Sequence, residues 1–157
     1  MKNVLFVCTG NTCRSPMAEA WLKVLCARDG LDWVVRSAGL DAYAGDQASL
    51  HAQETIHAAG GDLANHASRR FSAYLAAEAD LILAMTRSHL QRIRALVPEA
   101  AGKSFLLMHF SRLHPDTDVP DPFGGSSDDY RNCFETMREA VENLKNSLTD
   151  NKQPNQG

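Results

Sequence analysis

The chain has 157 residues, which is enough for one domain that buries a hydrophobic core without disulfides or metals. With 44% hydrophobic residues, 22% charged residues and a net charge of -3, it has the composition of an ordinary globular protein and gives no indication of nucleic-acid binding. The hydrophobic run after Lys2 and Asn3 is too short for a signal peptide or a membrane span, so we expect a cytoplasmic protein that does not bind membranes.

The first predicted elements are a strand, a short loop and a helix. The apolar run of residues 4–7 favours a strand. Ser15 and Pro16 suit the N-cap and the first turn of a helix that ends near Arg28. The apolar spacing along this helix predicts a buried stripe, which consists of Ala18, Leu22 and Leu25, with Trp21 beside them.

Strands and helices alternate along the rest of the chain. Further strands are predicted at residues 33–38, 81–85 and 104–108, and further helices at residues 49–59, 72–79 and 86–97. A last helix starts at Ser126 or Ser127 and runs to Leu148. This alternation is typical of a three-layer α/β fold, with a parallel sheet of about four strands and helices on both faces. We expect a single domain over residues 1–148 and a disordered tail over residues 149–157.

The four cysteines match no metal or disulfide pattern. Their spacings fit neither a zinc site nor the framework of a small secreted domain, so we expect reduced thiols and no bound metal. Cys26 and Cys133 fall within helical patterns and are expected to be small buried side chains. Cys8 and Cys13 lie close together after the first strand and need a separate explanation.

The segment after the first strand, residues 8–16, has the composition of an anion site. It begins with Cys8 at the end of the strand and closes on Arg14 and Ser15 where the helix starts. Backbone N–H groups of such a loop and the positive end of a helix dipole converge at the carboxyl edge of the sheet. We therefore expect the thiolate form of Cys8 to be stabilised there. The chain contains neither G-x-x-x-x-G-K-[ST] nor G-x-G-x-x-G, so neither a nucleoside triphosphatase nor a dinucleotide enzyme is indicated.

These residue types suit phosphoryl transfer. The planar guanidinium of Arg14 matches the equatorial oxygens of a phosphoryl group better than an ammonium would. The leaving group needs a proton, and the long segment of residues 109–126, which shows no periodicity, offers carboxyl groups for this role. The candidates are Asp116, Asp118 and Asp121, which this reasoning does not rank. A cysteine thiolate that forms a cysteinyl-phosphate needs neither a metal nor a cofactor.

Two runs of residues resemble the low-molecular-weight protein tyrosine phosphatase family: C-T-G-N-T-C-R-S-P at residues 8–16 and D-P-F-G at residues 121–124. The resemblance implies that Cys8 is the nucleophile, that Arg14 binds two phosphate oxygens and that Asp121 is the general acid. It implies a phosphate-binding loop after the first strand, made of Thr9, Gly10, Asn11, Thr12, Cys13, Arg14 and Ser15. The expected partners are phosphorylated protein substrates, and the expected state is a monomer.

The resemblance also matches Ser37 and His66 to residues that hydrogen-bond Asn11 and support its loop. The remaining histidines are expected to be ordinary surface or loop residues, namely His51, His57, His89, His109 and His114.

Cys13 lies five residues after Cys8, close enough around a tight loop to form a disulfide with it on oxidation. A reversible disulfide would protect the thiol of Cys8 from overoxidation. The alternative is that Cys13 is a small buried residue without a redox role.

Three positions bear on the choice of substrate. Many tyrosine-specific members carry a bulky aliphatic residue where this chain has Thr12, and two aromatic residues after D-P where this chain has Phe123 and then Gly124. Both departures resemble the bacterial branch that includes protein arginine phosphatases. Tyr43, in contrast, lies where some tyrosine phosphatases place an aromatic residue in the pocket wall. We favour phosphoarginine slightly, with phosphotyrosine as the alternative.

Two other functions fit the residues less well. An arsenate reductase of the same fold would need further cysteines, commonly just beyond the third strand, and residues 81–90 contain none. A noncatalytic phosphate-binding module would have little reason to combine Cys8, Arg14 and Asp121.

Overall fold

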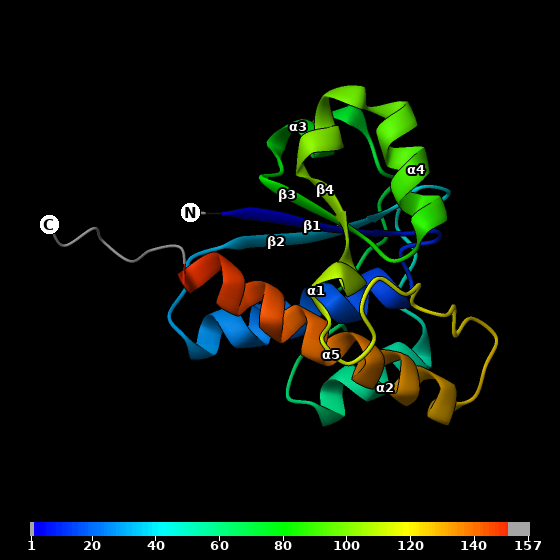
Figure 1. The fold of residues 1–157 in the computed structure, drawn as a ribbon. Helices are drawn as coiled ribbons and strands as arrows, with labels where there is room; N and C mark the ends of the chain where they lie inside the picture. Colours follow the sequence, from blue (N-terminus) through cyan, green and yellow to red (C-terminus); the bar gives the residue numbers. More distant parts are fainter. Residues whose placement is uncertain (1, 151–157) are drawn as a thin grey trace, which may run out of the picture.

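The computed structural model describes residues 2–150, which form a parallel sheet with helices on both faces (Figure 1). The strand order is β2-β1-β3-β4, and every pairing is parallel. The strands are β1 (Asn3–Cys8), β2 (Val34–Gly39), β3 (Leu81–Ala84) and β4 (Ser104–Leu106). The predicted three-layer α/β fold is confirmed.

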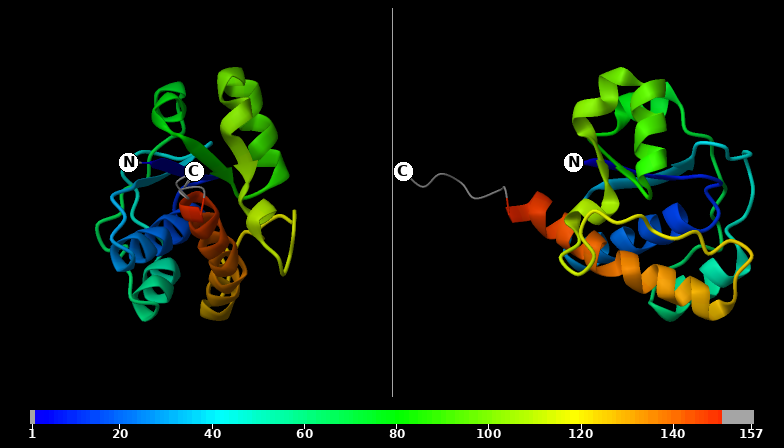
Figure 2. Two further views of the ribbon diagram at one scale, coloured as in Figure 1. Left: turned by 60° about the vertical axis from the view of Figure 1, so that its left-hand side comes forward. Right: turned by 45° about the vertical axis from the view of Figure 1, so that its right-hand side comes forward.

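The helices divide between the two faces of the sheet. One face is covered by α1 (Arg14–Arg28), α2 (Leu50–Ala58) and α5 (Ser127–Asp150), and the other by α3 (Ala73–Glu78) and α4 (Arg87–Leu96). Figure 2 shows these two layers on either side of the strands. Two short 3-10 helices, η1 (Pro98–Lys103) and η2 (Leu107–Phe110), flank β4. Within residues 2–150, no helix combines the length and the apolar character needed to cross a membrane.

Strand β1 is buried on both faces because its alternate side chains point into different cores. Val4, Phe6 and Cys8 belong to the core shared with α1 and α5. Leu5 and Val7 belong to the core formed with α3 and α4. Fully burying a large apolar side chain stabilises the fold by about 1.5–3 kcal/mol. The burial on two sides therefore fixes β1 in the middle of the sheet, with Cys8 at its carboxyl end.

The chain changes direction across the sheet at β1. The connection through α1 leads to β2 on one side of β1, whereas β3 pairs with its other side. The carboxyl ends of β1 and β3 therefore form a topological switch point, the place where ligands bind in open α/β sheets. The loop that follows β1 starts at this point.

Helix α1 begins at Arg14 rather than at Pro16, and the prediction that Ser15 caps it is wrong. Cys13 occupies the N-cap position without a capping side-chain hydrogen bond, and Ser15 lies buried in the first turn. Its hydroxyl contacts other residues of the preceding loop instead. The first backbone N–H groups of α1 therefore remain suited to binding an anion. The predicted stripe of this helix is buried, at Ala18, Trp21, Leu22 and Leu25.

Most of the other predicted helix boundaries agree with the structure. The hydroxyls of Ser72 and Thr86 accept a hydrogen bond from the backbone N–H three residues on, at the starts of α3 and α4. At the start of α5, the side chains of Ser126 and Asp129 accept from each other's backbone N–H groups, which is a capping box. Helix α5 ends at Asp150, two residues beyond its predicted end. Residues 151–157 of the predicted tail lie outside the described residues.

Strand β4 is shorter than predicted. It ends at Leu106, and the chain then turns into η2, which buries Leu107 and Met108. A short buried apolar run has the same composition in a strand and in a 3-10 helix, so periodicity did not distinguish them. After η2 the chain has no helix or strand over residues 111–126, which confirms most of the predicted long loop.

Candidate active site

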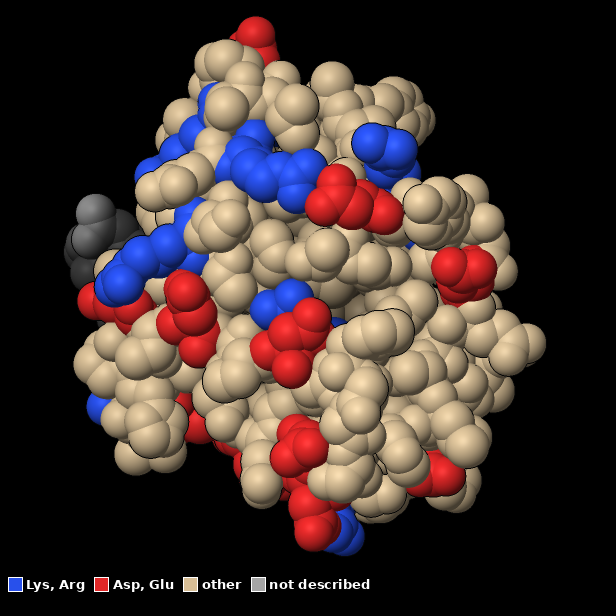
Figure 3. Space-filling model, turned by 90° about the vertical axis from the view of Figure 1, so that its right-hand side faces the viewer, with Lys and Arg blue, Asp and Glu red and all other residues tan. Residues whose placement is uncertain are grey.

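The candidate active site lies at the carboxyl end of β1, where Cys8 ends the strand and residues 9–13 lead into α1. Cys8 is buried, with 2% of its surface exposed, and its Sγ lies 2.8 Å from Oγ of Ser15. A serine hydroxyl at this distance can donate to a thiolate and stabilise its negative charge. Figure 3 shows this side of the molecule, where cationic and anionic side chains lie next to each other around the centre.

Asn11 is the centre of the hydrogen bonds within the loop. Its φ is 57°, in the left-handed region that asparagine tolerates better than most non-glycine residues. Its Nδ2 donates to Oγ of Ser15 at 2.9 Å and to Oγ of Ser37 at 2.8 Å. Its Oδ1 accepts from the backbone N–H of Arg69 at 2.9 Å, and its carbonyl accepts from Nε2 of His66 at 2.8 Å. The structure thus places Ser37 and His66 against Asn11, where the family resemblance puts them.

Gly39 also supports the loop, and the sequence reasoning missed it. This glycine ends β2, and a Cβ atom there would lie 2.5 Å from the carbonyl oxygen of Thr9 and 2.8 Å from the backbone nitrogen of Asn11. Only glycine permits so close an approach between β2 and the loop. The signal was present in the sequence, because a glycine within a strand often marks close contact between backbones.

Arg14 is buried, with 5% of its side chain exposed, and its guanidinium is held mainly by neutral groups. Nη1 donates to the carbonyl of Val119 at 3.0 Å, and Nη2 donates to Oγ1 of Thr9 at 3.4 Å. The carboxylate of Asp121 lies 3.7 Å from Nη2, and its side chain is 53% exposed. A buried cation is stabilised by a hydrogen-bonded anion. The guanidinium is therefore well placed to bind a phosphoryl group.

The three aspartates of the long loop have different partners. Asp118 accepts from the backbone N–H of Arg87 at 2.8 Å, and Asp116 lies 3.2 Å from Nδ1 of His109. Asp121 is the one of the three that forms an ion pair with Arg14. The geometry therefore ranks the three acids, which the reasoning from residue types left open.

His89 is not an ordinary surface residue, so that prediction is wrong. It is buried in the first turn of α4, with 5% of its surface exposed, and its Nε2 lies 2.8 Å from Oγ1 of Thr9. Burial, followed by the nearby charge of Arg14, lowers the pKa of His89 to about 4. The sequence did contain a signal. The helix predicted at residues 86–97 directly follows a predicted strand, and in a parallel sheet a helix that starts there has its first turn at the carboxyl edge.

Cys13 is buried against α2 and α5. Its Sγ lies 3.2 Å from the hydroxyl of Tyr130 and 3.5 Å from Oγ of Ser49. Burial and the hydrogen bond with Cys13 raise the pKa of Tyr130 to about 12. Both Cys13 and Cys8 are free thiols in this structure. The redox role of Cys13 stays a prediction.

Cys26 and Cys133 are buried, as predicted. Burial raises the pKa of both thiols, and that of Cys133 reaches about 12. Because the thiolate is the reactive form, neither residue competes with Cys8 as a nucleophile near neutral pH.

The predicted specificity residues lie in segments that contact the site. Thr12 is half-buried within the loop itself. Tyr43 and Phe123 are 81% and 76% exposed. Tyr43 follows Asp41, whose backbone N–H donates to the loop, and the backbone N–H of Phe123 donates to Asp121 at 3.0 Å. Both aromatic rings are therefore exposed, on segments whose backbones contact the loop after β1 or Asp121.

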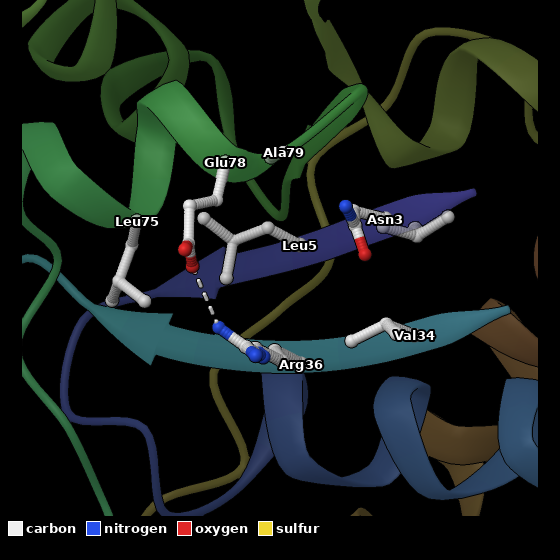
Figure 4. Close-up of a pocket in the computed structure, with 8 residues that line it drawn as sticks. Asn3, Leu5, Val34, Arg36, Leu75, Glu78 and Ala79 are labelled. Carbon is white, nitrogen blue, oxygen red and sulfur yellow. Dashed lines mark hydrogen bonds and ion pairs between the residues drawn. The ribbon is translucent and has the colours of Figure 1, made fainter. Parts of the chain in front are cut away.

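Two surface pockets differ in their relation to this site. One of about 430 Å³ adjoins Asp121 and is lined by the end of the long loop and by α5. Another of about 330 Å³ lies along the starts of β1 and β2, near Asn3 and Val34, where Arg36 pairs with Glu78 at 3.0 Å (Figure 4). The second pocket contains none of the predicted site residues. Within residues 2–150, no three His, Cys, Asp or Glu side chains gather in an arrangement that would hold a metal ion.

Comparisons with known proteins show the family to which the chain is similar. The family model described as low molecular weight phosphotyrosine protein phosphatase matches residues 3–154. The chain is 41% identical over 149 residues to a protein-arginine-phosphatase of Bacillus subtilis, covering 93% of this chain and 96% of the relative. It is 33% identical over 148 residues to the low molecular weight protein-tyrosine-phosphatase Etp of Escherichia coli, covering 94% and 95%. The solved structure of the YwlE arginine phosphatase from Geobacillus stearothermophilus superimposes with a TM-score of 0.88 at 37% identity, covering 97% of this chain and 96% of that one. The chain therefore belongs to the low molecular weight phosphotyrosine protein phosphatase family.

Proposed function

We propose that this phosphatase removes phosphoryl groups from protein side chains through a cysteinyl-phosphate intermediate, with phosphoarginine as the favoured substrate. The observation that carries the proposal is the convergence of three groups at the carboxyl end of β1. Cys8 supplies a buried sulfur, Arg14 a buried guanidinium and Asp121 a carboxyl group next to that guanidinium. Membership of the family supports the same chemistry.

Phosphate binding would use the backbone of residues 9–15 together with Arg14. The loop N–H groups and the uncapped start of α1 attract an anion, because the helix dipole places partial positive charge there. The guanidinium binds two phosphate oxygens with parallel N–H donors. This arrangement holds the phosphorus near Sγ of Cys8 and stabilises the charge of the transition state.

In the first step, the thiolate of Cys8 attacks phosphorus, and the bond from phosphorus to the side-chain nitrogen or oxygen breaks. Asp121 gives its proton to the departing group, which therefore leaves as a neutral guanidine or phenol rather than as an anion. In the second step, the carboxylate of Asp121 takes a proton from water, the water oxygen attacks phosphorus and the S–P bond breaks. Ser15 donates a hydrogen bond to the departing thiolate, from 2.8 Å. The products are inorganic phosphate and the free side chain.

Thr12 is the residue that favours phosphoarginine. Its hydroxyl can orient a polar guanidine or the attacking water, where a branched alkyl group would pack against an aromatic ring. The named arginine phosphatases of Bacillus subtilis and Geobacillus stearothermophilus support this reading. The exposed rings of Tyr43 and Phe123 favour phosphotyrosine as the second candidate, because aromatic side chains can pack against a tyrosine ring.

We also propose that the enzyme acts as a monomer in the cytoplasm. Every side chain of the site comes from one chain, and a cysteine nucleophile requires a compartment that keeps thiols reduced.

A comparison of kcat/KM on phosphoarginine and phosphotyrosine peptides tests the substrate. We expect the wild type to prefer phosphoarginine and Thr12→Ile to shift the preference towards phosphotyrosine, by about 10-fold or more for a change of one polar contact. A strong preference of the wild type for phosphotyrosine that Thr12→Ile leaves unchanged would show the assignment to be wrong. Cys8→Ser is the control, and it should lose turnover while it still binds inorganic phosphate.

A further inference from the structure

We propose that His89 and Thr9 act as a positioning pair that holds the guanidinium of Arg14 in the orientation needed to bind phosphate. The inference rests on the proposed function, because it concerns the same site. In the proposed function Thr9 contributes only its backbone N–H group. The inference gives a role to its side chain as well, and to a histidine far from the catalytic motifs in the sequence.

The pair joins two segments that are 80 residues apart in the chain. Thr9 is the first loop residue after β1, and His89 lies in the first turn of α4, whose start is fixed by a hydrogen bond from the backbone N–H of His89 to Thr86. The ring is buried, and its Nε2 lies 2.8 Å from Oγ1 of Thr9. Helix α4 is anchored in the core on the far side of the sheet from α1, through Ile93. It therefore provides a fixed point outside the loop.

The direction of the hydrogen bonds follows from the donors available. A guanidinium can only donate, so Oγ1 of Thr9 accepts from Nη2 of Arg14 whichever tautomer His89 adopts. His89 holds the threonine hydroxyl in both tautomers, because Nε2 either accepts a hydrogen bond from the hydroxyl or donates one to its oxygen. The ring is kept neutral by burial and by the cations Arg14 and Arg92, since these lower its pKa to about 4. A neutral ring does not repel the guanidinium.

Arg14 is thereby restrained from two sides. Val119 holds Nη1 through its carbonyl at 3.0 Å, and Thr9 holds Nη2 at 3.4 Å. The remaining N–H donors of the guanidinium are left for phosphate oxygens. The ring of His89 has a further polar atom, Nδ1, that is buried and makes no hydrogen bond to the described residues. Leaving a buried polar atom without a protein partner costs stability, so the position of the ring is not explained by its own hydrogen bonding alone.

The test uses three variants and two measurements. Thr9→Val removes the hydroxyl without changing the shape of the side chain, His89→Leu removes the ring nitrogens, and His89→Gln keeps a polar group that can reach Thr9. Turnover is measured as kcat and KM on a phosphorylated peptide, and binding of inorganic phosphate is measured by calorimetry. Thermal unfolding reports whether each variant folds.

We expect Thr9→Val and His89→Leu each to weaken phosphate binding and to lower kcat/KM by about 10- to 100-fold, which is typical of residues that orient a ligand-binding group. Because the two residues act through one contact, the double variant should lose little more than either single variant. His89→Gln should recover most of the loss. Ser88→Ala, an exposed position on the same turn of α4, should match the wild type in both measurements.

Fully additive losses, or phosphate binding that is unchanged in Thr9→Val, would overturn the proposal. If His89→Leu fails to fold, Thr9→Val still decides, because it leaves the buried ring in place. Failure of the proposed function would look different. The wild type would then turn over no phosphorylated peptide, while the calorimetry would still report whether the pair positions Arg14 for binding phosphate.

Discussion

Two aspartates of the long loop lie close together in the sequence but have different neighbours. Asp116 and Asp121 are five residues apart, yet the first lies beside His109 and the second beside Arg14. A carboxyl group can protonate a leaving group only if it reaches the same phosphoryl group as the guanidinium. Asp121, which pairs with Arg14, is therefore the proposed general acid, and Asp116 is not.

Asp121→Asn should therefore lower kcat on a phosphorylated peptide by about 10²- to 10⁴-fold, the usual contribution of a general acid. The loss should be smaller on p-nitrophenyl phosphate, because nitrophenolate leaves readily without a proton. Steady-state kinetics on both substrates checks this expectation.

Asp116→Asn is the matched control. Its φ of 58° lies in the left-handed region, which asparagine tolerates, so the substitution should leave both the backbone and kcat unchanged. Equal losses in the two variants, or an equal loss of Asp121→Asn on both substrates, would show that Asp121 is not the general acid.

The proposed catalytic residues could be identified from the sequence because they lie within two short runs. Cys8 and Arg14 are separated by one loop, and Asp121 stands in D-P-F-G. His89 could not be assigned in this way. Its partner Thr9 is 80 residues away, and a lone histidine on a helix has no local pattern that distinguishes a buried contact from an exposed side chain.

Among the elements, the contact between β2 and the loop after β1 sets the shape of the site. The parallel register pairs Cys8 with Gly39, so the two strands end side by side. The backbone N–H groups of Leu40 and Asp41 then donate to the carbonyls of Cys8 and Thr9, both at 2.9 Å. The first part of the phosphate-binding loop is therefore an extension of the sheet.

Gly39→Ala should disturb this extension. Its methyl group would meet the backbone of Thr9 and Asn11 at 2.5 Å and 2.8 Å, so the loop must shift. We expect a loss of about 1–3 kcal/mol in the free energy of unfolding and weaker binding of inorganic phosphate. Urea unfolding and calorimetry measure the two effects.

Gly102→Ala is the control for this substitution, because no atom lies within 4 Å of a Cβ built at that glycine. It should leave both measurements close to those of the wild type. If Gly39→Ala binds phosphate as tightly as Gly102→Ala does, the shape of the loop does not depend on the end of β2.

The elements were easier to predict than their ends. Apolar runs and the alternation of strands and helices predict the sheet, because burial on two faces requires them. The predicted start of α1 was wrong because the hydroxyl of Ser15 contacts Cys8 and Asn11 and does not cap the helix. Which partners the Ser15 hydroxyl takes depends on contacts within the folded loop, and local helix propensity does not describe these.

At the scale of the whole molecule, the site lies between the two layers of helices. Arg14 comes from the layer of α1 and α5, His89 comes from the layer of α3 and α4, and the end of β1 joins them. Folding therefore places a neutral imidazole near two arginines, Arg14 and Arg92, and two aspartates, Asp118 and Asp121. The stability of the protein should consequently depend on the protonation of this one ring.

The direction of that dependence follows from the two pKa values of His89. The pKa is about 4 in the folded protein and about 6.5 in the unfolded chain, so the unfolded chain takes up a proton first as the pH falls. This group therefore leaves stability unchanged above pH 6.5 and lowers it progressively towards pH 4, by on the order of 2–3 kcal/mol in total. His89→Gln does not titrate and should lack this component.

Urea unfolding at a series of pH values between 7 and 4.5 measures the difference between the wild type and His89→Gln. Carboxylates, including Asp118 and Asp121, titrate in both proteins, so their contribution largely cancels in the difference. We expect the wild type to lose more free energy of unfolding than the variant over this range, with the two curves diverging below pH 6.5. Parallel curves would mean that the ring is protonated as readily in the folded protein as in the unfolded chain. In that case His89 would become a cation next to Arg14 below about pH 6.5, and the pair with Thr9 would not provide a neutral support for the guanidinium at those pH values.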